Sequence, residues 1–249
     1  MNYDEFLVRI KEIKDMDYVI SHRSNDTGIG KTLEDLLGIT ENNIAGPDFD
    51  LYELKSARKN TASMLTLFTK VPQPRNANKI LLDIFGYQTR KKKDVPSDDV
   101  EIIVPSDPVN IGDKELHITV DSTRFNSIGL KLGVINETLF LLNEKNVEVY
   151  YEKEYLLEAF NKKYSHKLIY VLADRQKEKN QPEKFWYNEA FLLEDIDFDN
   201  FMNLISSGTI KLDIRIGHYP NGKPHDHGTG FRILPRDLPK CFRIMNPLI

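Results

Sequence analysis

The apolar run at residues 168–173 (LIYVLA) restricts the fold most, because six consecutive apolar residues suit a strand buried on both faces of a sheet. Two earlier segments, 3–16 and 29–37, have apolar residues at helical spacing. Residues 48–57 (DFDLYELKSA) alternate as a strand does, and residues 63–68 (SMLTLF) are expected to be the apolar partner strand. The chain is therefore expected to be an α/β protein with a mixed central sheet flanked by helices.

In the rest of the chain, segments with apolar residues at helical spacing alternate with segments that have strand spacing. Helices are expected at residues 77–85, 155–164 and 198–205, and a meander of short strands between residues 117 and 152. Strands at 185–193 and 209–216 precede a polar hairpin, 217–229, with its returning strand at 231–234. The basic and proline-containing residues 89–110 predict an arm.

Composition limits the class of protein. A chain of 249 residues with 40% hydrophobic residues can bury one large core or two modest ones, and we expect two lobes. It has no long apolar run, and its charged first residues lack a signal-peptide core, so we expect a cytoplasmic protein without a membrane span. The single cysteine, Cys241, excludes an internal disulfide and is interpreted as a small packed residue.

The net charge of -4 is unfavourable for nucleic-acid binding, but the distribution of the charges matters more than their sum. Ten lysines and arginines lie between Lys55 and Lys93, where Asp83 is the only acid. Such a span is often only a solvated face, but it is also able to follow a phosphate backbone.

Residues 27–38 (TGIGKTLEDLLG) resemble the end of a phosphate-binding P-loop. The earlier glycine of that motif is replaced by Asn25, and the preceding segment is too short and polar for a buried strand. The segment is better interpreted as the start of an amphipathic helix. In that helix Glu34 is the residue that needs an explanation.

The pattern Glu53-x-Lys55 places a carboxylate and an ammonium on one face of a strand. Alone it is most often a surface ion pair. Here an aspartate precedes it, Asp48 or Asp50, and strand spacing does not choose between them, because either needs a bend to reach the same side. With Glu34, these groups are able to bind a hard divalent cation and to position water, as phosphodiester hydrolysis requires.

A second chemically rich segment is residues 211–233 (KLDIRIGHYPNGKPHDHGTGFRI). Its HxH pair is a weak zinc signal, and a solvated hairpin is the simpler interpretation. A two-stranded ribbon also fits the major groove, where arginine, histidine and carboxylate side chains read G·C pairs. The candidate base-reading residues are Asp213, Arg215, His225, His227 and Arg232.

The blocks TGIGKTLEDLLG, PDFDLYELKS, LTLFTK, DIRIG and HDHGTGFRI resemble, in this order, the MvaI/BcnI family of type II restriction endonucleases, which is related to the mismatch-repair nicking enzyme MutH. The resemblance covers most of the chain and is densest at residues 27–71 and 209–234. It implies a PD-(D/E)XK nuclease core, Mg²⁺ as cofactor, double-stranded DNA as partner, and a second DNA-recognition lobe containing a β-hairpin.

Carried over by motif position, the resemblance assigns the catalytic residues as Glu34, Asp48, Glu53 and Lys55. Asp48 and Glu53 would bind Mg²⁺, Lys55 would act on the attacking water, and Glu34 would support the site. The resemblance, not the spacing, favours Asp48 over Asp50. Lys31 and Lys70 are further candidate DNA contacts, and the segment at residues 65–70 is the alternative reader of the central base pair, from the minor groove.

The resemblance further implies cleavage at a CCNGG-like site, for which the HDHGT and FRI blocks favour CC(A/T)GG. We expect a catalytic lobe at residues 1–88 and about 150–195, a recognition lobe at 196–249 with its hairpin at 209–234, and an arm and meander at 89–149 assigned to neither lobe. The enzyme is expected to be a monomer, with a cognate DNA methyltransferase in its host. A MutH-like nicking repair enzyme and a non-catalytic DNA-binding protein are the alternatives.

Overall fold

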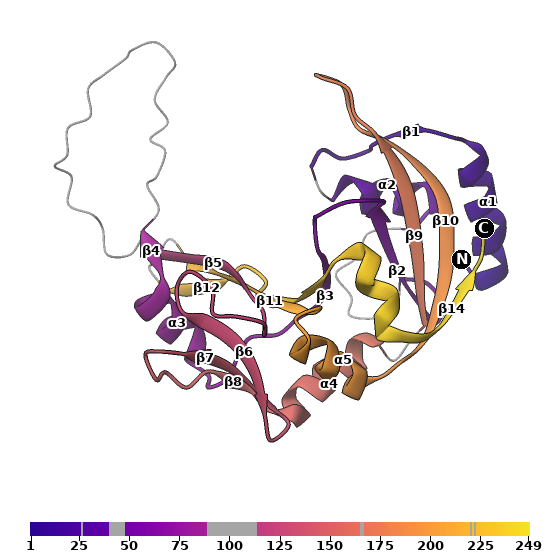
Figure 1. Cartoon of the computed structure of the whole chain (residues 1–249). Helices are drawn as coiled ribbons and strands as arrows, with labels where there is room; N and C mark the ends of the chain where they lie inside the picture. The colour runs from indigo at the N-terminus through magenta and orange to yellow at the C-terminus, as the bar shows by residue number, and fades with distance from the viewer. Residues whose placement is uncertain (26, 40–47, 89–113, 165–166, 220, 222) are drawn as a thin grey trace, which may run out of the picture. The chain divides into compact units, whose positions relative to one another are not determined.

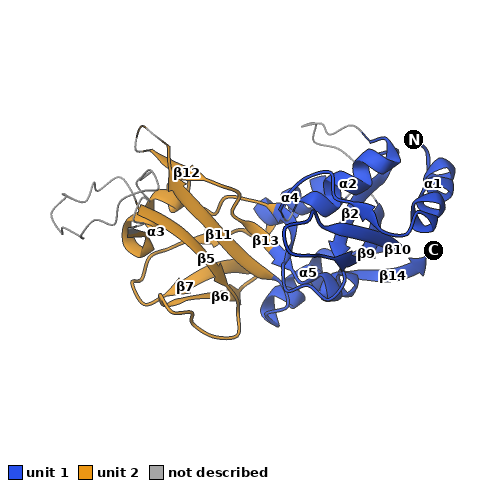
Figure 2. Cartoon of the chain, turned by 90° about the horizontal axis from the view of Figure 1, so that it is seen from above, with its two compact units in different colours: residues 1–68, 154–210, 232–249 blue, residues 69–153, 211–231 orange. Residues whose placement is uncertain are grey.

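The computed structural model describes residues 1–25, 27–39, 48–88, 114–164, 167–219, 221 and 223–249. They form two compact units, coloured separately in Figure 2. Unit 1 comprises Met1–Phe68, Glu154–Ile210 and Arg232–Ile249, and unit 2 comprises Thr69–Lys153 and Lys211–Phe231. The expected arm at residues 89–110 lies outside the described residues.

Unit 1 contains a mixed five-stranded sheet of order β1-β10-β9-β2, with β14 also paired to β10 (Figure 1). β2 runs parallel to β9, whereas β10 pairs antiparallel with β1, β9 and β14. The strand bounds are β1 Val19–Ile20, β2 Tyr52–Arg58, β9 Lys167–Gln176, β10 Lys184–Ile196 and β14 Phe242–Pro247. The apolar run at 168–173 therefore occupies a central strand, as its composition predicts.

Both faces of β9 are buried, and different helices cover them. Ile169 and Val171 join a core with residues of α1 (Tyr3–Asp15) and α2 (Gly28–Leu37). Tyr170 points to the other side and donates its hydroxyl to the Pro235 carbonyl at the start of η1 (Pro235–Cys241). This burial on both faces explains why the strand has no polar alternation.

An aromatic cluster holds α4 (Lys153–Tyr164) against α5 (Phe198–Ser206). The Phe160 ring contacts the rings of Phe198 and Phe201 at centroid distances of 5.4 and 5.3 Å. Residues 196–210 therefore belong to unit 1, although their position next to the hairpin led us to expect them in the recognition lobe. The C-terminal residues 232–249 also lie in unit 1.

One local expectation was wrong. β3 (Leu65–Thr69) is not the partner of β2, since β3 lies in a different sheet and β2 pairs with β9. Closeness in sequence suggested a hairpin, but a parallel pairing with a much later strand supplies the hydrogen bonds of β2. Thr27 lies at the start of α2 without a side-chain capping hydrogen bond, whereas Gly38 ends that helix in the left-handed conformation with φ 74°.

Unit 2 is built mainly from strands. β11 (Lys211–His218) pairs antiparallel with β5 (Lys114–Val120) and with β12 (Pro224–Asp226), and β5 pairs with β4 (Tyr87–Gln88). A separate sheet contains β6 (Leu130–Ile135), β7 (Thr138–Asn143) and β8 (Tyr150–Tyr151). The expected meander is therefore divided, because its first strand, β5, joins the sheet of β11.

Residues 69–88 also lie in unit 2, although we expected them in the catalytic lobe. The reason is α3 (Ala77–Phe85), which contacts β5, β11 and β12. The chain passes between the units within β3 and again within β13 (Gly230–Ile233). Among the described residues, no helix is both long enough and apolar enough to cross a membrane.

Candidate active site and recognition strands

The residues of the Glu-x-Lys pattern meet at one point of β2 in unit 1. The Lys55 ammonium lies 3.4 Å from Glu53 Oε1, as expected for side chains two residues apart on a strand. Both groups are largely withdrawn from water, with side-chain exposures of 15% for Lys55 and 7% for Glu53. Desolvation lowers the pKa of the Lys55 ammonium, and the Glu53 carboxylate only partly opposes this shift.

A tight turn at residues 49–52 places the two aspartates differently relative to β2. Asp50 has a left-handed φ of 49° in this turn, and both Asp48 and Asp50 are exposed. Asp48 comes back to β2, where its Oδ2 accepts a hydrogen bond of 2.6 Å from the Leu54 N–H. This turn is the bend that the odd spacing requires, and it brings Asp48, rather than Asp50, to the strand that carries Glu53. Desolvation raises the pKa of the Asp48 carboxyl, even though its hydrogen bond with Leu54 opposes the shift.

Glu34 reaches the same site from α2. It lines a pocket of roughly 220 Å³ together with Lys55 and Ser56. A methyl group at Gly30, one turn earlier, would lie 3.9 Å from both Glu34 Oε1 and Ser56 Oγ. The helix and the strand are therefore close enough for Glu34 to face the Lys55 side of the cluster.

Lys163 was missed by sequence reasoning. It lies in the last turn of α4, and its ammonium is 2.5 Å from Glu53 Oε1, closer than Lys55. In the sequence it is one of two adjacent lysines, and its neighbour Lys162 is exposed. Local pattern offers no signal that separates the two, because only the packing of α4 brings one of them to Glu53.

The donor set suits a hard cation in part. Mg²⁺ is commonly held by one or two carboxylates plus water and substrate phosphate oxygens, and Asp48, Glu53 and Glu34 supply carboxylates here. In the described ranges, no three His, Cys, Asp or Glu side chains form a ready metal site. In this structure the Glu53 carboxylate instead forms ion pairs with the Lys55 and Lys163 ammonium groups.

The recognition candidates lie in unit 2, on neighbouring strands. Asp213 and Arg215 share one face of β11, where Arg215 Nε donates to Asp213 Oδ2 at 2.8 Å. Asp213 Oδ1 also accepts from the Thr119 hydroxyl at 3.0 Å, and its side chain is only 2% exposed. The expectation that Asp213 reads a base directly is therefore corrected: it holds Arg215, whose side chain is 42% exposed.

The two histidines of the HDHGT block lie beside that arginine. His227 donates its backbone N–H to the Arg215 carbonyl, and its ring lies 4.2 Å from the ring of His225. Tyr219 stacks on His225 at 4.0 Å. His117, which pairs with Arg215 across the sheet, has its ring 6.0 Å from that of His227, and no sequence motif pointed to it.

Asp226 lies between those histidines and has a different use. Its Oδ1 accepts from the Gly228 and Thr229 N–H groups at 2.7 and 2.5 Å, and its Oδ2 accepts from the Asn78 amide at 3.0 Å. The carboxylate is therefore bound into the turn.

The remaining DNA-binding candidates, Lys31, Lys70 and Arg232, lie on other elements. Lys31 forms an ion pair of 2.7 Å with Asp35 within α2. Lys70 donates its backbone N–H to the Thr229 carbonyl in unit 2. Arg232 lies on β13 between the buried residues Phe231 and Ile233, so its side chain leaves the opposite face of that strand.

Comparisons with known proteins identify the family of the chain. The family model described as "MvaI/BcnI restriction endonuclease family" matches residues 7–242. The structure of restriction endonuclease MvaI in a complex with cognate DNA is similar with a TM-score of 0.75 and 29% identity, covering 100% of both chains. MvaI in the absence of DNA is similar with a TM-score of 0.59 and 28% identity, covering 100% of this chain and 99% of that one. None of the curated protein sequences compared with the chain matches it. The chain belongs to the MvaI/BcnI restriction endonuclease family, and its fold is that of the MvaI endonuclease.

Proposed function

We propose that this restriction endonuclease is of type II and hydrolyses both strands of double-stranded DNA at a CCNGG-like site, CC(A/T)GG, with Mg²⁺. The observation that carries the proposal is the convergence of Asp48, Glu53 and Lys55 on β2, with Glu34 facing the same pocket. The similar MvaI structure contains its cognate DNA, which supports DNA as the substrate.

Asp48 and Glu53 are the residues that would hold the cation. When bound, Mg²⁺ supplies charge stabilisation to the phosphoryl oxygens. Lys55 positions the attacking water and, because its lowered pKa makes the neutral amine more accessible, accepts a proton from it. The water oxygen bonds to phosphorus as the bond to the leaving sugar oxygen breaks, and solvent protonates that leaving oxygen.

Recognition belongs to β11 and its neighbours. Asp213 fixes the guanidinium of Arg215 through Nε, so its terminal nitrogens are presented in one orientation. An arginine held in this way suits guanine O6 and N7 in the major groove. His225, His227 and Arg232 are the further base-reading candidates, and Lys31 and Lys70 are proposed phosphate contacts.

The experiment is to incubate the purified protein with plasmid and Mg²⁺ and then map the ends. Double-strand ends at one short sequence, abolished by a chelator, are the expected result. Nicks alone would support the MutH-like repair enzyme, and tight specific binding without cleavage would support a non-catalytic DNA-binding protein. We expect a monomer in solution, and a cognate methyltransferase in the host that protects the same sequence.

A further inference from the structure

Unit 1 contains a second pocket, of roughly 620 Å³, that none of the residues above accounts for. It is formed by the segment before α2, the end of β2 with the residues after it, and the connection between β9 and β10. Among its described lining residues are four cations, Arg23, Arg58, Arg175 and Lys177, but one carboxylate, Glu183.

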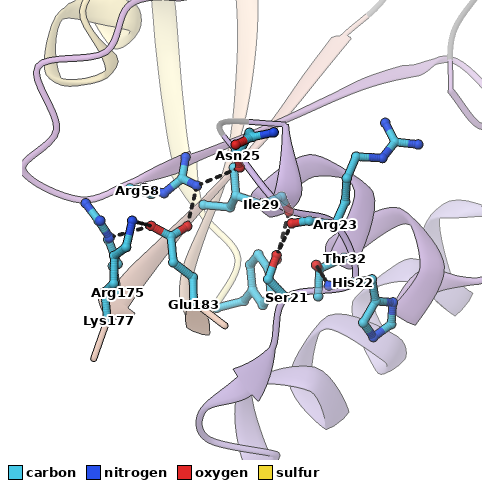
Figure 3. Close-up of polar contacts among 11 residues, drawn as sticks. Ser21, His22, Arg23, Asn25, Ile29, Thr32, Arg58, Arg175, Lys177 and Glu183 are labelled. Atoms are coloured by element: carbon cyan, nitrogen blue, oxygen red, sulfur yellow. Dashed lines mark hydrogen bonds and ion pairs between the residues drawn. The ribbon is translucent and has the colours of Figure 1, made fainter. Parts of the chain in front are cut away.

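Three of these cations converge on that carboxylate (Figure 3). Glu183 Oε2 accepts from Arg58 at 2.6 Å, and its Oε1 lies 2.8 Å from Arg175 Nε and 3.8 Å from Lys177 Nζ. Burial alone would raise the pKa of Glu183, but the Arg58 hydrogen bond and the three positive charges outweigh it and lower the pKa. The carboxylate therefore stays ionised and neutralises one of three charges.

The three cations differ in how firmly they are held. Arg58 is 8% exposed, lies 5.1 Å over the Phe185 ring and donates to the Asn25 carbonyl. Arg175 and Lys177 are 42% and 58% exposed. The pocket thus has a fixed cationic floor and two cations at the rim, which suits an anion arriving from solvent.

The pocket adjoins the candidate active site. Ser56 lines the pocket of Glu34 and Lys55, and Arg58 lines the basic pocket. Ser56 and Arg58 leave one face of β2, roughly 7 Å apart along the strand, whereas Glu53 and Lys55 leave the other face. In the segment that leads into β3, Ser63 lines the basic pocket and Leu65 lines the pocket of Glu34. Each DNA strand carries one phosphate for about every 3.4 Å of helix axis, so DNA bound at the first pocket would bring further phosphates toward the second.

We infer that the pocket of Arg58, Arg175, Lys177 and Glu183 binds a backbone phosphate of the DNA strand, away from the bond that is cut. This inference rests on the proposed function. The contact is to phosphate and carries no base information, so it strengthens binding to every sequence equally.

The test compares two double variants that each remove two positive charges. Arg175→Gln with Lys177→Gln empties the rim, and Lys179→Gln with Lys184→Gln is the control, because those lysines do not line the pocket. Dissociation constants are measured without divalent cation on a duplex containing the recognition site and on a scrambled duplex, over a range of salt concentrations. Thermal melting confirms that each variant is folded.

The rim variant should bind both duplexes at least about tenfold more weakly. The slope of log K against log salt concentration should fall by roughly 1 for each phosphate that the variant no longer binds. Equal weakening in the rim and control variants, or weakening confined to the recognition duplex, would overturn the inference. A wild-type protein that binds neither duplex would instead overturn the proposed function, so the two failures are distinguishable.

Inorganic phosphate titrated into the wild type should displace DNA only weakly. Strong displacement at low concentration would identify a site for free phosphate instead.

Discussion

β2 and β11 each carry an acid and a base two residues apart on one strand face, and the two pairs have different surroundings. On β2, Glu53 and Lys55 lie 3.4 Å apart, and a second ammonium, Lys163, shares the carboxylate. On β11, Asp213 and Arg215 lie 2.8 Å apart, and the arginine extends to solvent. Desolvation shifts the pKa of the lysine, whereas the guanidinium keeps its charge in any such site. We therefore propose that the same sequence pattern serves cleavage on β2 and base reading on β11.

Among the variants that test this comparison, Lys55→Ala is expected to have the largest effect. Cleavage should fall by about 10² to 10⁴-fold, because the group that positions the water and takes its proton is removed. Binding to the recognition duplex should be unchanged, since the base-reading residues lie on other strands. Single-turnover cleavage and a binding isotherm measure the two quantities, and a variant that still cuts at the normal rate would refute the assignment.

Glu34→Gln should have a smaller effect, on the order of 10 to 100-fold in cleavage or in the apparent Mg²⁺ requirement. Glu34 lines the same pocket as Lys55, but it lies on α2 and not on β2. The matched control is Asp35→Asn, one residue later on the same helix, where the carboxylate instead pairs with Lys31 and His22. Cleavage titrated with Mg²⁺ separates them, and equal decreases in both variants would reduce Glu34 to a structural role.

Arg215→Lys keeps the charge on β11 but removes the guanidinium that Asp213 orients. Discrimination between the recognition duplex and a duplex with one G·C pair changed should fall by about 1 to 3 kcal/mol. Binding to scrambled DNA should be nearly unchanged. Competition binding measures the difference, and uniform weakening on all sequences would make Arg215 a phosphate contact.

Gly217→Ala should give the smallest effect. The added methyl group would lie 2.8 Å from His227 Nε2, so the imidazole must move while the strand is kept. Discrimination should fall by about 1 kcal/mol or less, with thermal stability close to that of the wild type. His227→Ala serves as the reference variant. If Gly217→Ala has no effect while His227→Ala does, the close approach at Gly217 is unimportant.

The sequence predicted the elements better than their pairing. The apolar composition of residues 168–173 was enough to predict a central strand, because burial on both faces leaves no room for polar alternation. The partner of β2 was not predictable in this way, since a parallel pairing with β9 depends on the whole fold. For the same reason the sequence did not predict the compact units in which α5 and α3 lie, as their partners are distant in the sequence.

The residues of the candidate sites also differ in whether local structure or tertiary packing places them. Glu53 and Lys55 follow from strand geometry, and the turn that selects Asp48 is a local structure built on the left-handed Asp50. Lys163 and His117 reach their sites only through the packing of α4 and the register of β5, which no local pattern encodes. Asp213 was identified as important, but its burial beneath Arg215 changed its expected role from reading to positioning.

The most direct measurement is to digest a pool of duplexes of random sequence with Mg²⁺ and to sequence the cut ends, using the wild type and Arg215→Lys. The wild-type ends should define one short CCNGG-like sequence. The Arg215→Lys ends should come from a broader set that is relaxed at one G·C pair, with cutting retained. An unchanged set of ends, or a complete absence of cutting on every sequence, would contradict the claim that β2 cuts the DNA and β11 reads it.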